Sequence, residues 1–267
     1  MKEVLPLKAS LLVTLSAPLK PGATSRLSAA FERRLLEAAV MLEEVERAYW
    51  RGREVSEGRS SLQSISIGAA LLSAMSEVSR VTGERPMIGL LAASLSLSFM
   101  KGLSDGASRP LRANIRALVS SVLYRGNVED TLRLLEALEV SGDGELSELL
   151  ERRGVTKASA RMNALSPGNV YEVLGEVETG FWLNLRDLDR LLELSRSIEG
   201  ERGIVSAIQK AYLSLLEERG VAVRGKDVRE LLKLDATLRE QGSFDRLLGA
   251  VFLAGAIAAV ERWPWRA

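Results

Sequence analysis

Residues 87–100 read MIGLLAASLSLSFM, and none of these side chains is charged. On a helix the segment is apolar on nearly all sides, the pattern of a helix that other helices surround. At about 14 residues it is shorter than the roughly 20 needed to cross a bilayer. We therefore expect it to form the central buried helix of the fold.

Helical periodicity extends over most of the chain. Residues 27–51 carry apolar side chains three or four positions apart, which indicates one long amphipathic helix. Other segments with a helical pattern include 2–15, 62–81, 111–124, 128–138, 187–198, 204–218, 226–240 and 244–262. Short turns join them and no long linker divides them. The sequence predicts one all-α domain over 1–267, with roughly ten or eleven helices. Residues 155–168 are the least regular stretch, where we expect a lid or crossover.

The composition excludes several classes of site. The chain has no cysteine and no histidine, so disulfides, Cys nucleophiles, Ser-His-Asp triads and zinc sites built on Cys or His are excluded, and no haem is expected. Acid–base chemistry must use Asp, Glu, Lys, Tyr or water. Lys and Arg total 36 against 35 Asp and Glu, and this balance argues against general nucleic-acid binding.

The apolar segments also indicate where the protein works. We find neither a signal peptide nor a segment of membrane-spanning length, so we expect a cytoplasmic protein without membrane attachment. The lack of cysteine and the few Asn and Gln suit a heat-tolerant protein. Association into a homo-oligomer is possible.

The turn Lys20-Pro21-Gly22, with Arg26 four residues further on, is the first candidate site. A Pro-Gly turn can expose backbone N–H groups, and two nearby cations would favour a phosphate or carboxylate. The alternative is a helix–helix turn with solvated basic side chains.

Asp235 is the second candidate. It falls near the middle of an apolar helix face, with Arg239 beside it at i+4. A carboxylate there needs a partner, a metal or a proton. One interpretation is a structural ion pair with Arg239. The other is a carboxylate facing a cavity, where it could bind Mg²⁺ or a ribose.

Two further candidate sites could carry chemistry. Arg109, Arg112 and Arg116 share one face at the start of a helix and could bind a phosphate, or they could form an ordinary exposed basic face. Glu77 lies among small residues and could face a cavity; a plain surface glutamate is the alternative.

Short motifs occur in a fixed order along nearly the whole chain. Residues 20–26 read KPGATSR, Gly89 enters the apolar helix, residues 128–131 read VEDT and residues 140–144 read VSGDG. Near the end come Asp235-x-x-Leu238-Arg239 and then Asp245 in the sequence EQGSFDRL. In this order they resemble the triphosphoribosyl-dephospho-CoA synthase family, especially its archaeal members. A helix start after Ser243 would explain Asp245 without any function.

The motifs also depart from the family pattern. Ala23 replaces the Asn of the family's Lys-Pro-Gly-Asn-x-x-Arg turn, and residues 85–89 keep only the Gly of Asn-Thr-x-x-Gly. The family's terminal motif is Asn-Pro-Gly-Thr-Thr-Ala-Asp-Leu, and residues 240–247 read EQGSFDRL in its place. The Asp of the motif is therefore shifted by one position, about 100° around a helix. A family Asp-Thr pair has no clear match near 217–223.

The resemblance implies an all-α transferase that joins ATP to 3′-dephospho-CoA and releases adenine. Mg²⁺ would clamp the triphosphate, and the ligands would be a nucleotide and a CoA-type molecule. Asp235 and Glu77 would be the catalytic candidates, with Asp235 also a candidate for Mg²⁺. The proposed ligand-binding residues are Lys20, Gly22, Arg26, Gly89, Arg239, Asp245, Arg109, Arg112 and Arg116. The alternative is a non-catalytic relative that binds a nucleotide or phosphate ligand or serves as an assembly subunit; in that case Arg239 neutralises Asp235.

Overall fold

A buried helix, α4 (Ile88–Gly106), occupies the middle of the computed structural model. Every residue from Ile88 to Gly102 is buried, which confirms the prediction for this segment. The long helix α2 (Phe31–Ser56) packs along α4. Glycines allow the close approach: a Cβ added to Gly102 would lie 2.0 Å from the carbonyl oxygen of Tyr49, and one added to Gly52 would lie 2.1 Å from that of Phe99.

The structure describes residues 2–18, 20–25, 31–83, 86–241 and 244–262. Over these residues it contains thirteen α-helices and no strand, so the all-α prediction is confirmed. The remaining helices are α1 (Leu5–Ser16), α3 (Ile67–Thr82), α5 (Leu111–Val119), α6 (Val128–Ser141), α7 (Gly144–Arg152), α8 (Lys157–Met162), α9 (Pro167–Leu174), α10 (Leu188–Ser197), α11 (Ile204–Glu218), α12 (Val228–Gln241) and α13 (Leu248–Arg262).

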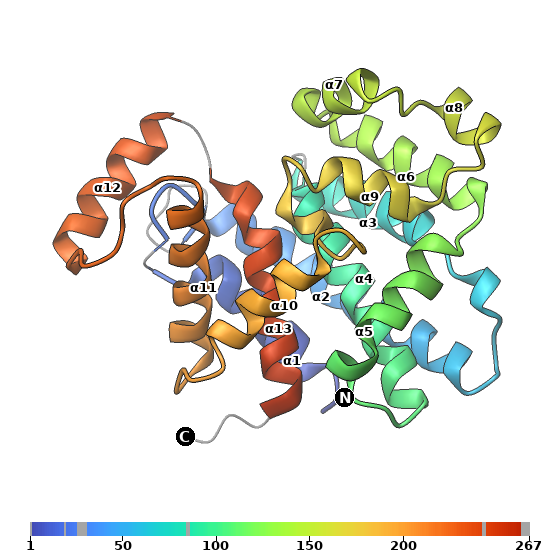
Figure 1. Ribbon diagram of the computed structural model, residues 1–267, viewed down its shortest axis with the longest axis horizontal. Coiled ribbons are helices and arrows are strands. Elements are labelled where there is room, and N and C mark those ends of the chain that lie inside the picture. Colours follow the sequence, from blue (N-terminus) through green and yellow to red (C-terminus); the bar gives the residue numbers. More distant parts are fainter. Residues whose placement is uncertain (1, 19, 26–30, 84–85, 242–243, 263–267) are drawn as a thin grey trace.

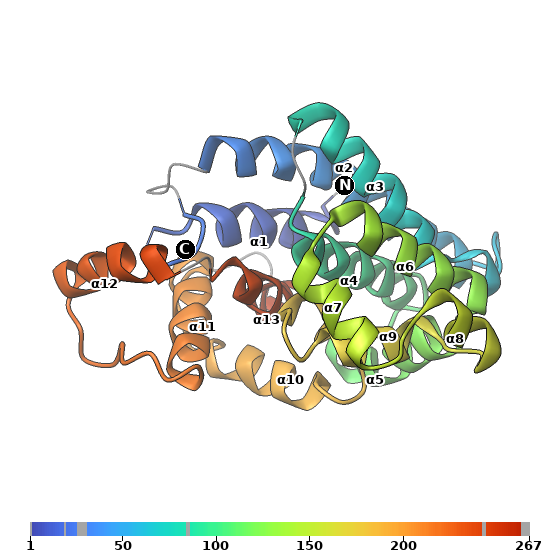
Figure 2. The ribbon, with the colours of Figure 1, turned by 90° about the horizontal axis from the view of Figure 1, so that it is seen from above.

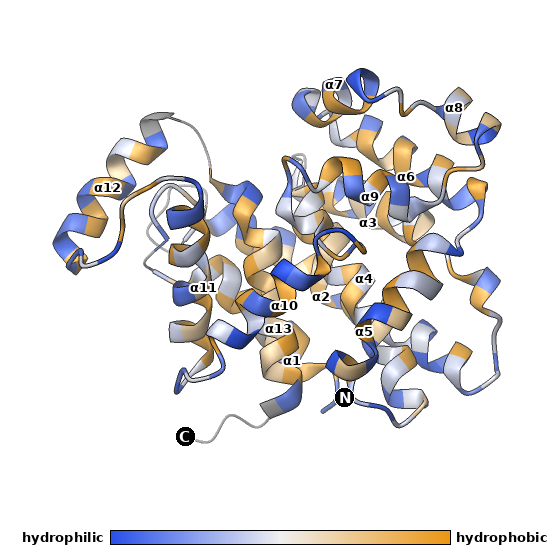
Figure 3. Ribbon diagram, in the orientation of Figure 1, coloured by the Kyte–Doolittle hydropathy of each residue, from blue (hydrophilic) through white to orange (hydrophobic). Residues whose placement is uncertain are grey.

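The helices form one continuous hydrophobic core. α13 packs against α1, α4, α10 and α11, while α3 packs against α2 and α6 (Figure 1). The most apolar helices, α1, α4 and α13, lie in the interior (Figure 3). α12 projects from one end of the body, and α7 and α8 lie toward the other end (Figures 1 and 2).

The irregular stretch 155–168 contains a short helix that the sequence did not reveal. α8 has only six residues, too few to show an amphipathic period. A capping box of Thr156 and Ser159 begins it, and another of Ser166 and Asn169 begins α9. Neither a lid nor a crossover is needed to describe this part of the chain.

Two segments near the ends of helices have tighter or wider turns. Residues Ser120–Tyr124 continue α5 as a π-helix, and Asp245–Leu247 form a 3-10 turn, η4, before α13. A second 3-10 turn, η3 (Thr179–Phe181), lies between α4 and α13. Within the described residues, no helix is long and apolar enough to cross a membrane.

Candidate functional site

The turn after α1 is held by the ammonium group of Lys20. This side chain is 1 % exposed, and its Nζ donates to the backbone carbonyls of Thr14, Leu15 and Thr24. Burial lowers the pKa of Lys20 to about 7, although the nearby charge of Asp245 opposes this shift. The ammonium group therefore organises the turn itself, where the sequence had suggested a ligand contact.

α12 contributes a clamp on the same turn. Asp235 Oδ1 accepts the backbone N–H of Gly22 at 2.7 Å, and its Oδ2 accepts Arg239 Nε at 3.0 Å. Arg239 Nη2 donates in turn to the Ala23 carbonyl at 2.9 Å. The hydroxyl of Tyr212 donates to the Pro21 carbonyl at 2.6 Å. Asp235 is therefore in the structural ion pair that the sequence left open as one interpretation.

Gly22 is required at the centre of this clamp. Its φ of +80° lies in the left-handed region, and an added Cβ would meet Phe244 Cδ2 at 2.8 Å and Leu238 Cβ at 2.9 Å. The Gly22 carbonyl accepts the Phe244 N–H at 3.1 Å. The turn consequently joins α12 to the segment that precedes α13.

Asp245 connects this turn to a cleft. Its carboxylate accepts the backbone N–H of Thr24 and, at 2.9 Å, the Thr24 hydroxyl. Its charge also acts on the ionisation of Lys20, Glu37 and Glu178. These groups come from four distant parts of the chain and form one electrostatic unit.

The cleft has a volume of about 330 Å³, near the lower end of the range for small-molecule sites. We call it the Glu178 cleft. Its described lining residues are Arg34 from α2, Pro86, Met87, Ile88 and Leu90 around the start of α4, Ser141, Gly142 and Asp143 from the α6–α7 turn, and Glu178, Asp245 and Arg246. Three of the segments that carry the family resemblance therefore meet here: the start of α4, the α6–α7 turn and the segment containing Asp245.

Glu178 is the most perturbed acid in this cleft. Its Oε1 accepts the Gly180 N–H at 3.1 Å, and burial raises its pKa to about 8. The side chain packs directly on Gly89, where an added Cβ would lie 2.2 Å from the Glu178 carboxyl carbon. Gly180 is itself packed between Gly89 and Gly249 of α13. Near neutral pH the carboxyl group thus keeps its proton and can act as a hydrogen-bond donor.

Two arginines supply positive charge around the cleft. Arg34 pairs with Glu37 at 2.6 Å, and Glu37 also accepts the Met87 N–H at 2.6 Å at the start of α4. Burial raises the pKa of Glu37, while Arg34 opposes the shift. Arg246 Nη2 contacts both oxygens of Asp143, at 2.9 and 3.0 Å. Arg246 Nη2 also pairs with Glu145 at 3.0 Å. Its Nη1 is buried without a hydrogen-bond partner among the described residues.

The acids do not form a dedicated metal cage. Among the described residues, no group of three or more acidic side chains is placed to hold a metal ion. Asp143, Asp235 and Asp245 each accept hydrogen bonds from neighbouring protein groups. Mg²⁺ is commonly held by one or two carboxylates together with substrate phosphates. Asp143 and Asp245 are the cleft carboxylates that could contribute to such a shared site.

Several residues that the sequence singled out lie elsewhere. Glu77 does not face a cavity: it is on the surface of α3, where it pairs with Arg80, and hydrogen bonding from Arg80 lowers its pKa. It is a surface glutamate because the small side chains of α3 pack against α2 and α6 on its other faces.

The three arginines at the start of α5 are also remote from the Glu178 cleft. Arg112 pairs with Glu199 and Glu261 and donates to Ser195 Oγ at 2.7 Å, and Arg116 pairs with Asp189. Arg109 is exposed. These side chains therefore mainly connect or flank helices. Arg26 lies outside the described residues.

One buried acid from the resembling motifs has a structural role. Asp130 of α6 accepts the Gly68 N–H and the Ser66 hydroxyl, both at 2.6 Å, and so holds the start of α3. Burial raises its pKa, and these donors oppose the shift.

The sequence interpretation missed Arg34, Asp143, Glu178 and Arg246 as cleft residues, and it missed Glu37, which pairs with Arg34. Glu178 is followed by Thr-Gly-Phe-Trp between two helical segments. This change in pattern indicates a turn, but it does not indicate that the Glu178 side chain is buried. Charge pairs such as Arg246 with Asp143 join residues about one hundred positions apart and leave no local signal.

Comparison with known proteins finds no matching family model, no matching curated protein and no matching solved structure.

Proposed function

We propose that the Glu178 cleft binds the phosphate-bearing part of a nucleotide, and that the chain is a divergent triphosphoribosyl-dephospho-CoA synthase-like transferase. The observation that carries the proposal is the convergence of the start of α4, the α6–α7 turn, Glu178 and Asp245–Arg246 on one cleft. Charged and polar groups from distant segments that meet in a concave site are typical of a binding site.

The chemistry of the lining fits an anionic ligand. Arg34 and Arg246 supply guanidinium groups, which suit phosphate oxygens through paired hydrogen bonds. The neutral carboxyl of Glu178 can face a phosphate or ribose oxygen without charge repulsion. In this proposal the ligands are ATP and a CoA-type acceptor, and Mg²⁺ arrives with the triphosphate. A cytoplasmic location belongs to the same proposal.

Glu178 is our candidate for proton transfer. In the proposed reaction the bond between adenine and the ATP ribose breaks, and a hydroxyl of the acceptor ribose bonds to the same carbon. The departing adenine takes up one proton and the hydroxyl loses one, so the reaction is balanced. A carboxyl group that is protonated near pH 7 can donate the first proton and accept the second.

A second candidate, ligand binding without transfer, has its own supporting observation. Lys20 and Asp235, which the resemblance would place at the ligand, are engaged by the protein's own backbone and by Arg239. A non-catalytic relative would keep the cleft and lose the transfer step. Association into a homo-oligomer stays a prediction in either case.

Adenine release distinguishes the two candidates. The protein is incubated with ATP, 3′-dephospho-CoA and Mg²⁺, and adenine and the joined product are measured by chromatography. The transferase proposal expects equal amounts of both products, loss of both in Glu178→Gln, and normal turnover in Arg133→Gln, which alters an exposed pair on α6. No adenine above the level without protein would contradict transfer, and saturable ATP binding in that protein would favour the second candidate.

A further inference from the structure

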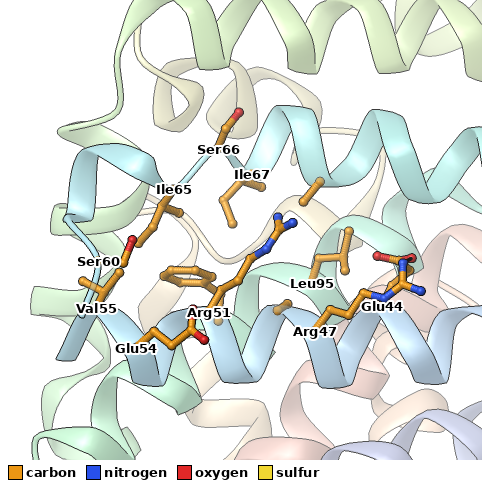
Figure 4. Close-up of a pocket in the computed structure, with 13 residues that line it drawn as sticks. Glu44, Arg47, Arg51, Glu54, Val55, Ser60, Ile65, Ser66, Ile67 and Leu95 are labelled. Carbon is orange, nitrogen blue, oxygen red and sulfur yellow. Dashed lines mark hydrogen bonds and ion pairs between the residues drawn. The ribbon is translucent and has the colours of Figure 1, made fainter. Parts of the chain in front are cut away.

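A second cavity, separate from the Glu178 cleft, opens between α2 and α3. Its volume is about 350 Å³. Figure 4 shows that α2 lies along one side and the segment from Ser60 to Ile67 along the other. None of its lining residues is shared with the Glu178 cleft.

The inner wall of this cavity is apolar. Ile67, Leu95 and Phe99 are at most 3 % exposed, and Ala48 lies beside them. Ile65 adds a further apolar side chain at the mouth. A purely polar or highly charged ligand would leave this wall without suitable contacts, so the inner part suits a hydrocarbon group.

Four charged residues line the cavity, and the side chains of two of them, Arg51 and Glu54, make no hydrogen bond or ion pair with any described residue. Arg47 is neutralised by Glu44 at 2.7 Å and contacts Glu43 at 3.4 Å. Arg51, one helical turn further on, makes no hydrogen bond or ion pair with any described residue, and its side chain reaches from α2 toward α3 near Ile67 (Figure 4). Glu54 lines the same mouth, where its charge would oppose a ligand with two negative charges.

We propose that this cavity binds a small amphipathic monocarboxylate, with its hydrocarbon part against Leu95 and Phe99 and its carboxylate on Arg51. The Arg51 guanidinium can donate two parallel hydrogen bonds to one carboxylate, and the neighbouring charge of Glu54 disfavours any further negative charge. If each heavy atom takes about the share of one liquid water molecule, the volume fits a ligand of about ten to twelve non-hydrogen atoms. This inference does not rest on the proposed transferase function.

The test measures octanoate binding to the whole protein by calorimetry. Octan-1-ol serves as the uncharged probe and octyl phosphate as the dianionic one. We expect saturable octanoate binding that Arg51→Gln weakens by about tenfold and that Glu54→Gln strengthens. Arg33→Gln, which alters an exposed arginine at the other end of α2, should leave binding unchanged.

A second variant tests the location independently of charge. Ala70→Leu places a larger side chain on the α3 wall of the cavity and should abolish octanoate binding while circular dichroism and the melting temperature stay near wild type. The proposal is overturned if octanoate does not bind at millimolar concentration, if it binds equally to Arg51→Gln, or if a folded Ala70→Leu protein binds it normally. Equal affinity for octan-1-ol, or tighter binding of octyl phosphate, would overturn the monocarboxylate assignment.

Discussion

Replacing Glu178 by Gln should remove a specific part of the pH dependence of stability. Burial raises the folded-state pKa of Glu178 to about 8, whereas its ordinary value is 4.5. Between these values the folded protein holds a proton that the unfolded chain has released. The contribution of Glu178 to stability is therefore fully present below pH 4.5 and is lost as pH rises through about 8.

The expected size follows from that interval. One proton corresponds to about 1.4 kcal/mol for each pH unit. Between pH 5.5 and 7.5, wild type should lose about 2.7 kcal/mol of unfolding free energy relative to Glu178→Gln. Glutamine keeps the shape that packs on Gly89 and keeps an oxygen to accept the Gly180 N–H, but it cannot ionise.

Urea unfolding followed by circular dichroism at several pH values measures this difference. Glu176→Gln is the matched control because Glu176 is an exposed neighbour whose pKa is lowered by hydrogen bonding from Arg153. That residue is ionised in both states over this pH range, so its substitution should produce no slope. If the wild-type and Glu178→Gln curves stay parallel between pH 5.5 and 7.5, Glu178 is ordinarily ionised and our account of the cleft acid is refuted.

Three further predictions concern the turn and the helix packing. Between pH 7.5 and 9.5 the unfolding free energy of wild type should rise relative to that of Lys20→Met by about 1.4 kcal/mol per pH unit, because the folded-state pKa of Lys20 lies below its ordinary value. Urea unfolding measures this difference, and a difference that stays constant with pH would contradict the prediction. Gly102→Ala should cost about 1–3 kcal/mol in thermal or urea unfolding because its Cβ would overlap the Tyr49 carbonyl, whereas Gly144→Ala, in open space, should cost nothing. Asp235→Ala should lower the free energy of unfolding by about 1–3 kcal/mol and leave ATP binding, measured by calorimetry, unchanged. Normal stability together with lost ATP binding would instead place the Asp235 carboxylate at the ligand.

The helices could be predicted because hydrophobic periodicity is a local property. The uncharged segment 87–100 marked the buried α4, and Asn127 marked the start of α6, where its side chain accepts the Asp130 N–H. The sequence did not predict α8, because six residues are too few to show a helical hydrophobic period. The close crossing of α2 and α4 also escaped, because a glycine shows its purpose only beside the backbone that it contacts.

The site was only partly predictable, for a related reason. Lys20, Arg26, Asp235 and Glu77 were expected around one ligand. The structure brings Lys20 and Asp235 to the same turn, whereas Glu77 lies on the surface of α3 and Arg26 is outside the described residues. The sequence could not show that the Lys20 ammonium and the Asp235 carboxylate already form hydrogen bonds to the backbone of this turn. Glu178 gained its role through burial against Gly89 of α4, which depends on tertiary packing alone.

Calorimetric titration of ATP, with and without Mg²⁺, tests the central claim about the Glu178 cleft most directly. We expect one saturable site that Arg246→Gln weakens by at least tenfold, because the Arg246 guanidinium lines the cleft and can bind phosphate oxygens. No heat at millimolar ATP under either condition, or equal affinity in wild type and Arg246→Gln, would contradict the claim.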